Sequence, residues 1–110
     1  MITTQYPELV ERRWGNFLKF IENQTCTVKL IHIKKDRAIH LQYHKNRSEQ
    51  WYVISGLTWI TNGELSKKMY PGDIVQIEKL SIHKMEGLED SVILEISKGI
   101  FDENDIVHLD

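Results

Sequence analysis

The chain has 110 residues, which suffices for one compact domain with a single hydrophobic core. Hydrophobic residues make up 41% of it and charged residues 27%, which suits a globular protein and excludes a disordered or membrane-spanning chain. The net charge is −2 and no run of basic residues is long enough to follow a phosphate backbone, so nucleic acid is excluded as an expected partner.

The first twelve residues show no alternation of apolar and polar residues. Pro7 and the charges beside it predict an N-terminal arm or one short helical turn over residues 1–12, followed by a single domain over residues 13–110. Pro7, Glu8 and Glu11 also interrupt any apolar region of a signal peptide, so secretion is not indicated.

The cysteine content bears on the compartment. Cys26 is the only cysteine, so no intrachain disulfide can form and a metal site with two cysteine ligands is excluded. We therefore expect a cytoplasmic protein without membrane contact.

Beyond residue 12, short runs of alternating apolar and polar residues predict β-strands, because many of them are rich in β-branched or aromatic side chains. Turn-forming pairs separate the runs, and Asn62-Gly63 is the strongest hairpin signal. Residues 103–110 allow a short turn or helix. The spacing predicts an all-β sandwich or barrel, with strands at residues 17–21, 28–33, 39–44, 51–55, 57–61, 74–77 and 92–96.

One predicted strand carries several polar side chains that bind metals. His40, Gln42 and His44 share one face of it, because side chains alternate between faces, and such a face either meets solvent or lines a polar cavity. A tight turn brings Glu49 back beside His44, and His83 can supply a further nitrogen. Imidazole nitrogens and carboxylate oxygens bind borderline divalent ions at about 2.0–2.2 Å, which predicts a single metal site.

These donors and the turns between them follow a fixed order along the chain. In that order the chain resembles the cupin superfamily, whose first motif is His-x-His or Gln-x-His, a glutamate and a glycine, and whose second is a Pro-Gly turn before a histidine. Within the superfamily it resembles the type II phosphomannose isomerases, which form the C-terminal domain of bifunctional mannose-1-phosphate guanylyltransferase/mannose-6-phosphate isomerases. The resemblance is carried by Arg13-Trp14-Gly15, Leu41-Gln42-Tyr43-His44, Arg47-Ser48-Glu49, Trp51, Val53, Ser55-Gly56, Pro71-Gly72, His83, Gly99 and Asp105-Ile106-Val107.

The resemblance implies a single-domain jelly-roll, an antiparallel β-barrel, that holds one divalent metal ion. It places the metal ligands at Gln42, His44, Glu49 and His83, with zinc as the expected ion and manganese, cobalt, nickel or iron as alternatives. The family interconverts mannose 6-phosphate and fructose 6-phosphate, an aldose–ketose isomerisation through an enediolate. A phosphorylated or nucleotide-linked sugar is therefore the expected partner, and a homodimer is expected by the same resemblance.

Five further residues are candidates for the chemistry. The candidate catalytic residues are His40 and Glu95. His40 is either a base near neutral pH or a rim residue of the cavity. Glu95 is either an inward-facing acid or a member of a salt bridge at the sheet edge. Arg47 and Lys29 are candidates for a phosphate contact, or else solvated charges. Trp51 either forms a wall of the sugar site or packs the core.

Departures from the family pattern leave two functions open. His108 stands where the family has arginine, so turnover on mannose 6-phosphate is expected to be low or lost if that arginine contacts the substrate, whereas metal binding is expected to survive. The chain is then either a sugar-phosphate isomerase or a non-catalytic module that binds metal and sugar. A metal-dependent oxygenase is disfavoured, because the glutamine ligand is typical of the isomerase branch.

Overall fold

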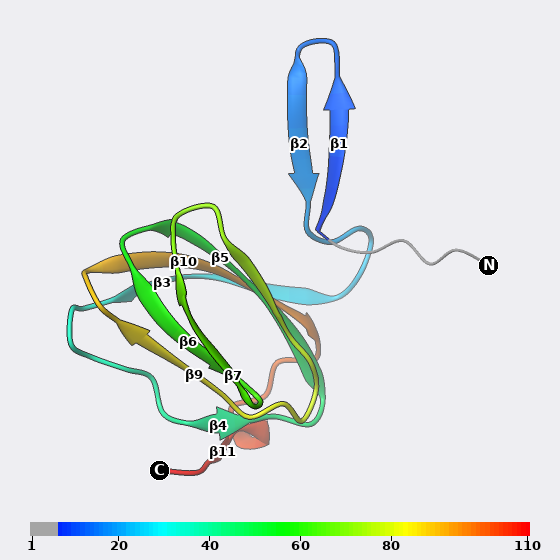
Figure 1. Cartoon of the computed structure of the whole chain (residues 1–110). Coiled ribbons are helices and arrows are strands. Elements are labelled where there is room, and N and C mark those ends of the chain that lie inside the picture. The colour runs from blue at the N-terminus through cyan, green and yellow to red at the C-terminus, as the bar shows by residue number, and fades with distance from the viewer. Residues whose placement is uncertain (1–6) are drawn as a thin grey trace.

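The structure is a computed structural model that describes residues 7–110, and it begins with a hairpin of β1 (Glu8–Arg12) and β2 (Gly15–Lys19). The hairpin stands clear of the two sheets that form the rest of the molecule (Figure 1). The alternative of a short helical turn is wrong for Glu8–Arg12, which form β1, whereas the N-terminal arm over residues 1–12 stays a prediction and residues 1–6 lie outside the described part. A domain boundary after residue 12 would divide this hairpin and stays a prediction.

Two antiparallel sheets make up the body of the molecule, as predicted for an all-β chain. One is four-stranded and the other five-stranded, and consecutive neighbours in each are hydrogen-bonded (Figure 1). The four-stranded sheet has the order β3 (Cys26–Ile33), β10 (Ser91–Gly99), β5 (Arg47–Ser55) and β8 (Ile74–Ile77). The five-stranded sheet has the order β11 (Val107–His108), β4 (Gln42–Tyr43), β9 (His83–Gly87), β6 (Thr58–Asn62) and β7 (Leu65–Met69).

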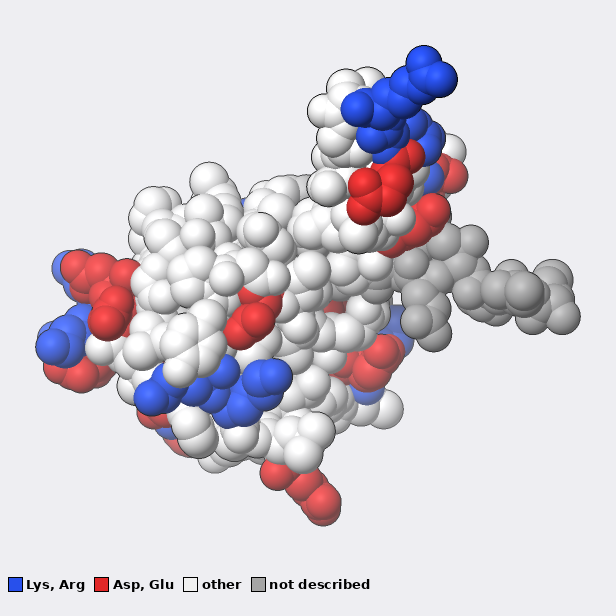
Figure 2. Space-filling model, turned by 45° about the horizontal axis from the view of Figure 1, so that its top comes forward, with Lys and Arg blue, Asp and Glu red and all other residues white. Residues whose placement is uncertain are grey.

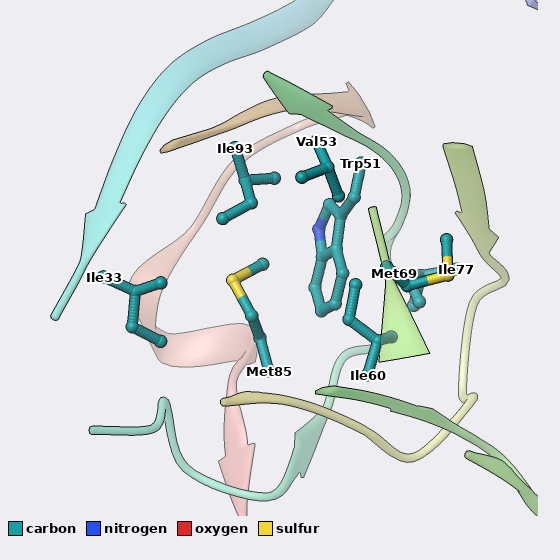
Figure 3. Packing of buried hydrophobic residues seen from close by; sticks show 8 residues of the cluster. All are labelled: Ile33, Trp51, Val53, Ile60, Met69, Ile77, Met85 and Ile93. Carbon is teal, nitrogen blue, oxygen red and sulfur yellow. The ribbon is translucent and has the colours of Figure 1, made fainter. Parts of the chain in front are cut away.

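The hydrophobic core lies between the two sheets, and both contribute to it (Figure 3). The central strands present alternate residues to the interior, as in β9 and the first half of β10, which is the period that the sequence shows in its apolar runs. Full burial of one such side chain stabilises the fold by about 1.5–3 kcal/mol, so the cluster supplies much of the stability that keeps the sheets together. Its buried members are Ile33, Trp51, Val53, Ile60, Met69, Ile77, Met85 and Ile93.

The predicted strands differ from the observed ones mainly where side chains are polar or the backbone is irregular. The run at residues 39–44 keeps strand structure only at Gln42–Tyr43. β7 was not predicted, because its centre of Ser66, Lys67 and Lys68 is exposed and shows no alternation. Among residues 7–110 the one helical element is a 3-10 turn at Glu103–Asp105, and no helix there is long or apolar enough to cross a membrane.

Candidate metal centre

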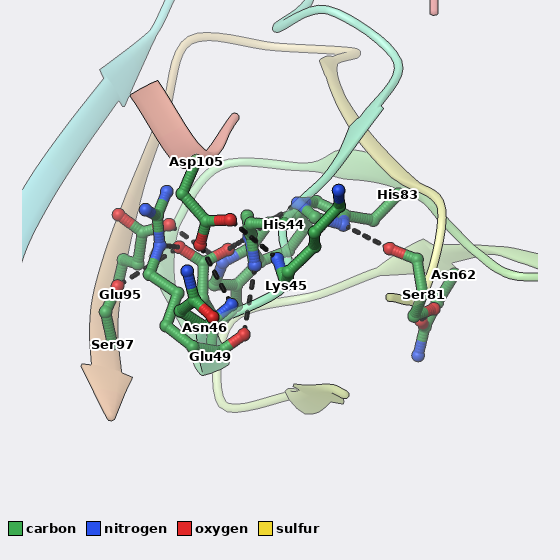
Figure 4. Close-up of polar contacts among 12 residues, drawn as sticks. His44, Lys45, Asn46, Glu49, Asn62, Ser81, His83, Glu95, Ser97 and Asp105 are labelled. Carbon is green, nitrogen blue, oxygen red and sulfur yellow. Dashed lines mark hydrogen bonds and ion pairs between the residues drawn. The ribbon is translucent and has the colours of Figure 1, made fainter. Parts of the chain in front are cut away.

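Three of the four predicted ligands meet inside the molecule. His44 follows β4, Glu49 lies on β5 and His83 opens β9, so three separate stretches of chain contribute one donor each. Their candidate ligand atoms all lie within 4.8 Å of one another, and all three residues are buried (Figure 4). Glu49 Oε1 is 3.1 Å from His44 Nε2 and 3.6 Å from His83 Nε2. A group of this composition can hold a divalent ion.

Backbone carbonyls fix which nitrogen of each imidazole is available. The Nδ1 of His44 donates to the carbonyl oxygen of Arg47 over 3.0 Å, and the Nδ1 of His83 donates to that of Ser81 over 2.8 Å. A carbonyl oxygen only accepts hydrogen bonds, so each ring carries a proton on Nδ1 and directs its Nε2 toward Glu49. Imidazoles that ligate metals in proteins are usually held in this way.

The Nε2 atom of His83 is buried and has no hydrogen-bond partner among the described residues. Burial lowers the pKa of His83, which keeps the ring neutral. Two imidazole nitrogens and a carboxylate oxygen therefore face one another in the buried interior, where the unpartnered Nε2 of His83 costs about 1–3 kcal/mol. A cation among these atoms would satisfy all three, so the donor set fits a metal ion.

Further contacts hold the carboxylate of Glu49 in its ionised form. Ser97 Oγ donates to Glu49 Oε2 over 3.1 Å, and Arg47 Nε lies 3.6 Å from the same oxygen. Burial by itself raises the pKa of Glu49, but contacts with His44 and Glu95 and the nearby imidazoles outweigh it and hold that pKa well below its usual range. Glu49 is therefore an anion that is oriented on both oxygens.

Glu95 is a buried acid beside Glu49. This position agrees with the interpretation of Glu95 as an inward-facing acid rather than as a member of a salt bridge at the sheet edge. It accepts a hydrogen bond from the indole Nε1 of Trp51 over 3.3 Å. Burial and the neighbouring Glu49 carboxylate raise the pKa of Glu95 to about 8, so it carries a proton at neutral pH. Trp51 itself is fully buried and packs edge-on against His83, with ring centroids 5.5 Å apart, which favours core packing over a wall of the sugar site.

Gln42, the fourth predicted ligand, lies on the strand next to His83. The two are direct register partners between β4 and β9, and residues opposite each other in an antiparallel pair project from the same face. His108 is in turn the register partner of Gln42 from β11, so His108, Gln42 and His83 form one row across the sheet. The backbone thus brings Gln42 to the metal group, and its ligation stays a prediction.

The other predicted site residues divide between the interior and the surface. Arg47 is buried and Lys29 half-buried, and their cationic groups lie 4.2 Å and 3.8 Å from the centroid of the Phe101 ring. His40 is exposed: its Nδ1 lies 3.1 Å from Asp110 Oδ1 and its ring stacks on that of His108. His40 is therefore not part of the group formed by His44, Glu49 and His83, and its position agrees with the rim interpretation.

Several residues that support the ligands were not predicted. The Asp105 carboxylate accepts hydrogen bonds from the backbone N–H groups of Lys45 and Asn46, which fixes the turn between His44 and Glu49 (Figure 4). Ser81, whose carbonyl holds His83, donates its hydroxyl to Asn62 Oδ1 over 2.7 Å. The partners in these contacts are up to 60 residues apart in the sequence, so most of the contacts could not be predicted from it. Only Ser81 lies close enough to His83 in the sequence to suggest a contact.

A small cavity opens between β6, β7 and β8. It has a volume of ≈ 120 Å³ and is lined mainly by apolar side chains together with Asn62 and Lys67. Asn62 is the register partner of His83, so the cavity wall is adjacent to the metal group. Sites for small molecules usually measure roughly 300–1,000 Å³, so this cavity is smaller than a typical sugar-phosphate site.

Comparison with solved structures supports the cupin fold, the antiparallel jelly-roll expected from the sequence. An oxalate decarboxylase from Bacillus subtilis superposes with a TM-score of 0.72 over 79% of this chain and 25% of that chain, at 21% sequence identity. A putative sugar phosphate isomerase from Acidithiobacillus ferrooxidans gives a TM-score of 0.62 at 24% identity, over 68% of this chain and 51% of that chain. At these identities the likeness establishes the fold alone.

The sequence places the chain within one family of that class. Residues 3–110 match the family model described as mannose-6-phosphate isomerase C-terminal, and the chain belongs to that family. It is 30% identical over 101 residues to mannose-1-phosphate guanylyltransferase 2 of Escherichia coli O157:H7, which covers 89% of this chain and 21% of that protein. Mannose-1-phosphate guanylyltransferase RfbM of Salmonella typhimurium is 29% identical, over 92% and 22% of the two chains. The chain therefore spans about a fifth of the length of these relatives.

Proposed function

We propose that the chain is a metal-dependent sugar-phosphate isomerase of the mannose-6-phosphate isomerase type that acts in the cytoplasm. The observation that carries the proposal is the approach of the Nε2 atoms of His44 and His83 to the ionised Glu49, with His83 Nε2 otherwise unpartnered. The family membership supports the choice of reaction. We propose one divalent ion, zinc in the first place, because neutral imidazoles and a carboxylate suit it.

Each residue of the site has a distinct proposed role. Gln42, His44, Glu49 and His83 would hold the ion, which when bound supplies a Lewis acid for the oxygens of the sugar. Glu95 is the proposed proton-transfer residue, because it is buried beside Glu49 and oriented by its hydrogen bond from the Trp51 indole. Its position favours it over the exposed His40 for a proton transfer next to a carbonyl group.

The phosphate of the substrate is assigned to Lys29 and Arg47. Both cations lie against the ring of Phe101, and Arg47 also approaches Glu49, which places positive charge at the edge of the metal group. An arginine offers paired donors that match phosphate oxygens, and a lysine acts as a point charge.

A specific observation favours the alternative of a non-catalytic module that binds metal and sugar. His44 and His83 have no exposed surface and Glu49 is 2% exposed, so the ligands are covered in this conformation. A catalytic metal site keeps one position open to water or substrate. In addition, His108 stands where the family resemblance places an arginine, and its ring stacks on that of His40.

The deciding experiment combines elemental analysis with a coupled assay on mannose 6-phosphate after loading with zinc, manganese, cobalt or nickel. Turnover that requires one bound ion per chain supports the isomerase. A loaded protein without turnover supports the module, and a protein that binds none of these ions refutes both functions.

A variant separates the role of Glu95 from that of the ligands. Glu95→Gln should retain the ion and lose at least about 100-fold in kcat, as expected for a general acid–base residue. Glu64→Gln, which alters an exposed acid in the β6–β7 turn, is the matched control and should keep full activity. Unchanged kcat in Glu95→Gln would remove that residue from the mechanism.

A further inference from the structure

Two cations that reach into the interior share one aromatic partner. The Nζ of Lys29 lies 3.8 Å from the centroid of the Phe101 ring, and the guanidinium carbon of Arg47 lies 4.2 Å from it. Lys29 is the register partner of the buried Glu95, so both side chains project from the inner face of the four-stranded sheet. Arg47 is itself only 2% exposed. The ring of Phe101 therefore covers a pair of cations.

The guanidinium of Arg47 is poorly satisfied for a buried cation. Its Nε has no hydrogen-bond partner among the described residues, and it lies 3.6 Å from Glu49 Oε2, beyond ordinary hydrogen-bond distance. One terminal nitrogen donates to the carbonyl oxygen of Asp102 over a long 3.4 Å. A guanidinium carries five N–H donors in a geometry that matches the oxygens of a phosphate. An oxyanion would therefore satisfy Arg47 better than the aromatic ring does.

The surface offers an anion less than this interior pair. The net charge of the chain is −2, and on the face drawn in Figure 2 basic and acidic side chains are interspersed between uncharged areas. Exposed charges are hydrated and screened by salt, whereas a cation of the interior attracts an anion more strongly. Lys29 and Arg47 are thus the best-placed cations for a phosphate group.

The segment that carries Phe101 is anchored at its two ends. At its start the Gly99 N–H donates to the carbonyl oxygen of Thr25 over 3.1 Å, and at its end the carboxylate of Asp105 accepts hydrogen bonds from two backbone N–H groups. Residues 102–104 between these anchors are exposed and belong to no strand. The ring can therefore leave the two cations without breaking the pairing of either sheet.

We propose that the Phe101 ring occupies a phosphate subsite formed by Lys29 and Arg47, and that a phosphate monoester binds by displacing it. The inference rests on the proposed function in one respect, the assignment of the substrate phosphate to these two cations. Paired hydrogen bonds from a cation to phosphate oxygens are stronger than the contact of a cation with a ring, which favours the exchange.

Displacement of the ring also bears on the candidate metal group. Phe101 lies on the guanidinium of Arg47, and Arg47 in turn approaches Glu49. The ring is thus the outer layer over one of the candidate ligands, and it contributes to the burial of that ligand in this conformation. A phosphate that takes the place of the ring would bring the rest of its molecule next to the metal group.

Calorimetric titration of the full chain with inorganic phosphate tests the displacement. Phe101→Ala should bind phosphate about 10-fold more tightly than the unaltered chain, as expected if the ring leaves the subsite open about one tenth of the time. Tyr70→Ala, which removes a 55% exposed aromatic ring before β8, is the matched control and should bind like the unaltered chain. All variants are compared at equal metal content, after circular dichroism has checked their fold. An unchanged or weaker affinity in Phe101→Ala would overturn the proposal.

A double substitution tests whether the gain acts through the cation pair. Lys29→Gln should weaken phosphate binding about 10-fold, because one of the two positive charges is lost. Adding Phe101→Ala to Lys29→Gln should then improve the affinity less than about 3-fold, since the ring covers only one remaining cation. A full 10-fold gain in the double variant would show that Phe101 does not act by covering this pair.

Fluorine NMR on the chain labelled with fluorophenylalanine follows the ring directly. The sequence contains three phenylalanines, so Phe17 and Phe20 serve as internal controls. Saturating phosphate should shift the resonance of Phe101, assigned by its loss in Phe101→Ala, and leave the other two unchanged. Phosphate that binds without this shift, or fails to bind to any of the variants, would refute the proposal. Neither result depends on turnover, so the inference can stand when the isomerase assay fails, and the reverse also holds.

Discussion

At the scale of single residues, the candidate metal centre depends on contacts that hold its candidate ligands in place. Glu49 is held on one oxygen by the imidazole group and on the other by Ser97, so neither oxygen is free to rotate away. His44 and His83 are each fixed through Nδ1 by a backbone carbonyl, which requires no particular side chain. Ser97 is therefore the supporting residue whose effect on metal binding can be tested by a simple substitution.

Ser97→Ala should weaken the affinity for zinc by roughly 10–100-fold, because contacts behind a metal ligand usually contribute that much. The substitution removes the hydroxyl that donates to Glu49 Oε2 and leaves the three ligands in place. Competition with a chelator of known affinity measures the change. Ser66→Ala, which removes an exposed hydroxyl bonded to Thr61, is the control, and equal affinities in the two variants would contradict the assigned contact.

A second prediction concerns position 108, where the resemblance places an arginine. His108 lies in the row that leads through Gln42 to His83, so a longer cationic side chain there reaches toward the metal group. If the isomerase proposal is correct, His108→Arg should raise kcat/KM for mannose 6-phosphate by at least about 10-fold, since each tenfold requires only ~1.4 kcal/mol of transition-state stabilisation. His32→Arg on β3 is the control. An unchanged kcat/KM at unchanged metal content would show that the missing arginine is not what limits turnover.

The meeting of His44, Glu49 and His83 could be predicted from the sequence, whereas the contacts that support these residues could not. The close spacing of His44 and Glu49 around one turn made their meeting visible, and the motif resemblance added His83. Ser97 meets Glu49 only because β10 and β5 pair in one register, and that register depends on the whole sheet. The burial that sets the ionisation of Glu95 likewise comes from the packed interior rather than from its neighbours in sequence.

At the scale of secondary-structure elements, turns with positive φ fix how the strands pair. Gly56, between β5 and β6, has φ of 90°, and a Cβ there would collide with Ser91 and the carbonyl of Asp90. Gly72, before β8, has a similar φ of 92° but open space around it. Substitution by alanine would therefore strain the backbone similarly at both positions, but only at Gly56 would the added Cβ also collide with neighbouring atoms.

This pair gives a matched test of close packing at the β5–β6 turn. Gly72→Ala should lower the free energy of unfolding by about 1–2 kcal/mol, which is the cost of forcing alanine into the left-handed region. Gly56→Ala should lose at least about 2 kcal/mol more, because its added carbon has no space beside backbone and side-chain atoms. Urea unfolding measures both values. Equal losses would show that the turn moves to accommodate the methyl group.

Strands were predictable where one face is buried and the other is not. The runs at residues 28–33, 51–55, 57–61, 74–77 and 92–96 overlap β3, β5, β6, β8 and β10, because the core imposes a period of two on each. β1 has apolar Leu9 and Val10 on opposite faces, so it shows no such period. A strand that stands clear of both sheets therefore leaves no alternation in the sequence.

At the scale of the whole molecule, the candidate ligands come from both sheets. His44 and His83 belong to the five-stranded sheet side of the interior and Glu49 to the four-stranded sheet, so a bound ion would bridge the two sheets. Such an ion would also give the buried Nε2 of His83 a partner. A ligand that binds the folded chain and not the unfolded one raises its stability by mass action.

Zinc should therefore raise the melting temperature of the chain. At a free concentration of about 100 times the dissociation constant, the stabilisation is about 2.7 kcal/mol, which for a domain of this size corresponds to roughly 10 °C or more. Calorimetry with and without chelator measures the shift. His44→Ala should melt at the same temperature under both conditions, while His32→Ala, at an exposed histidine on β3, should respond like the unaltered chain. This measurement needs no turnover. If zinc still raised the melting temperature of His44→Ala, the assignment of His44 as a ligand would be refuted under both the isomerase and the module proposal.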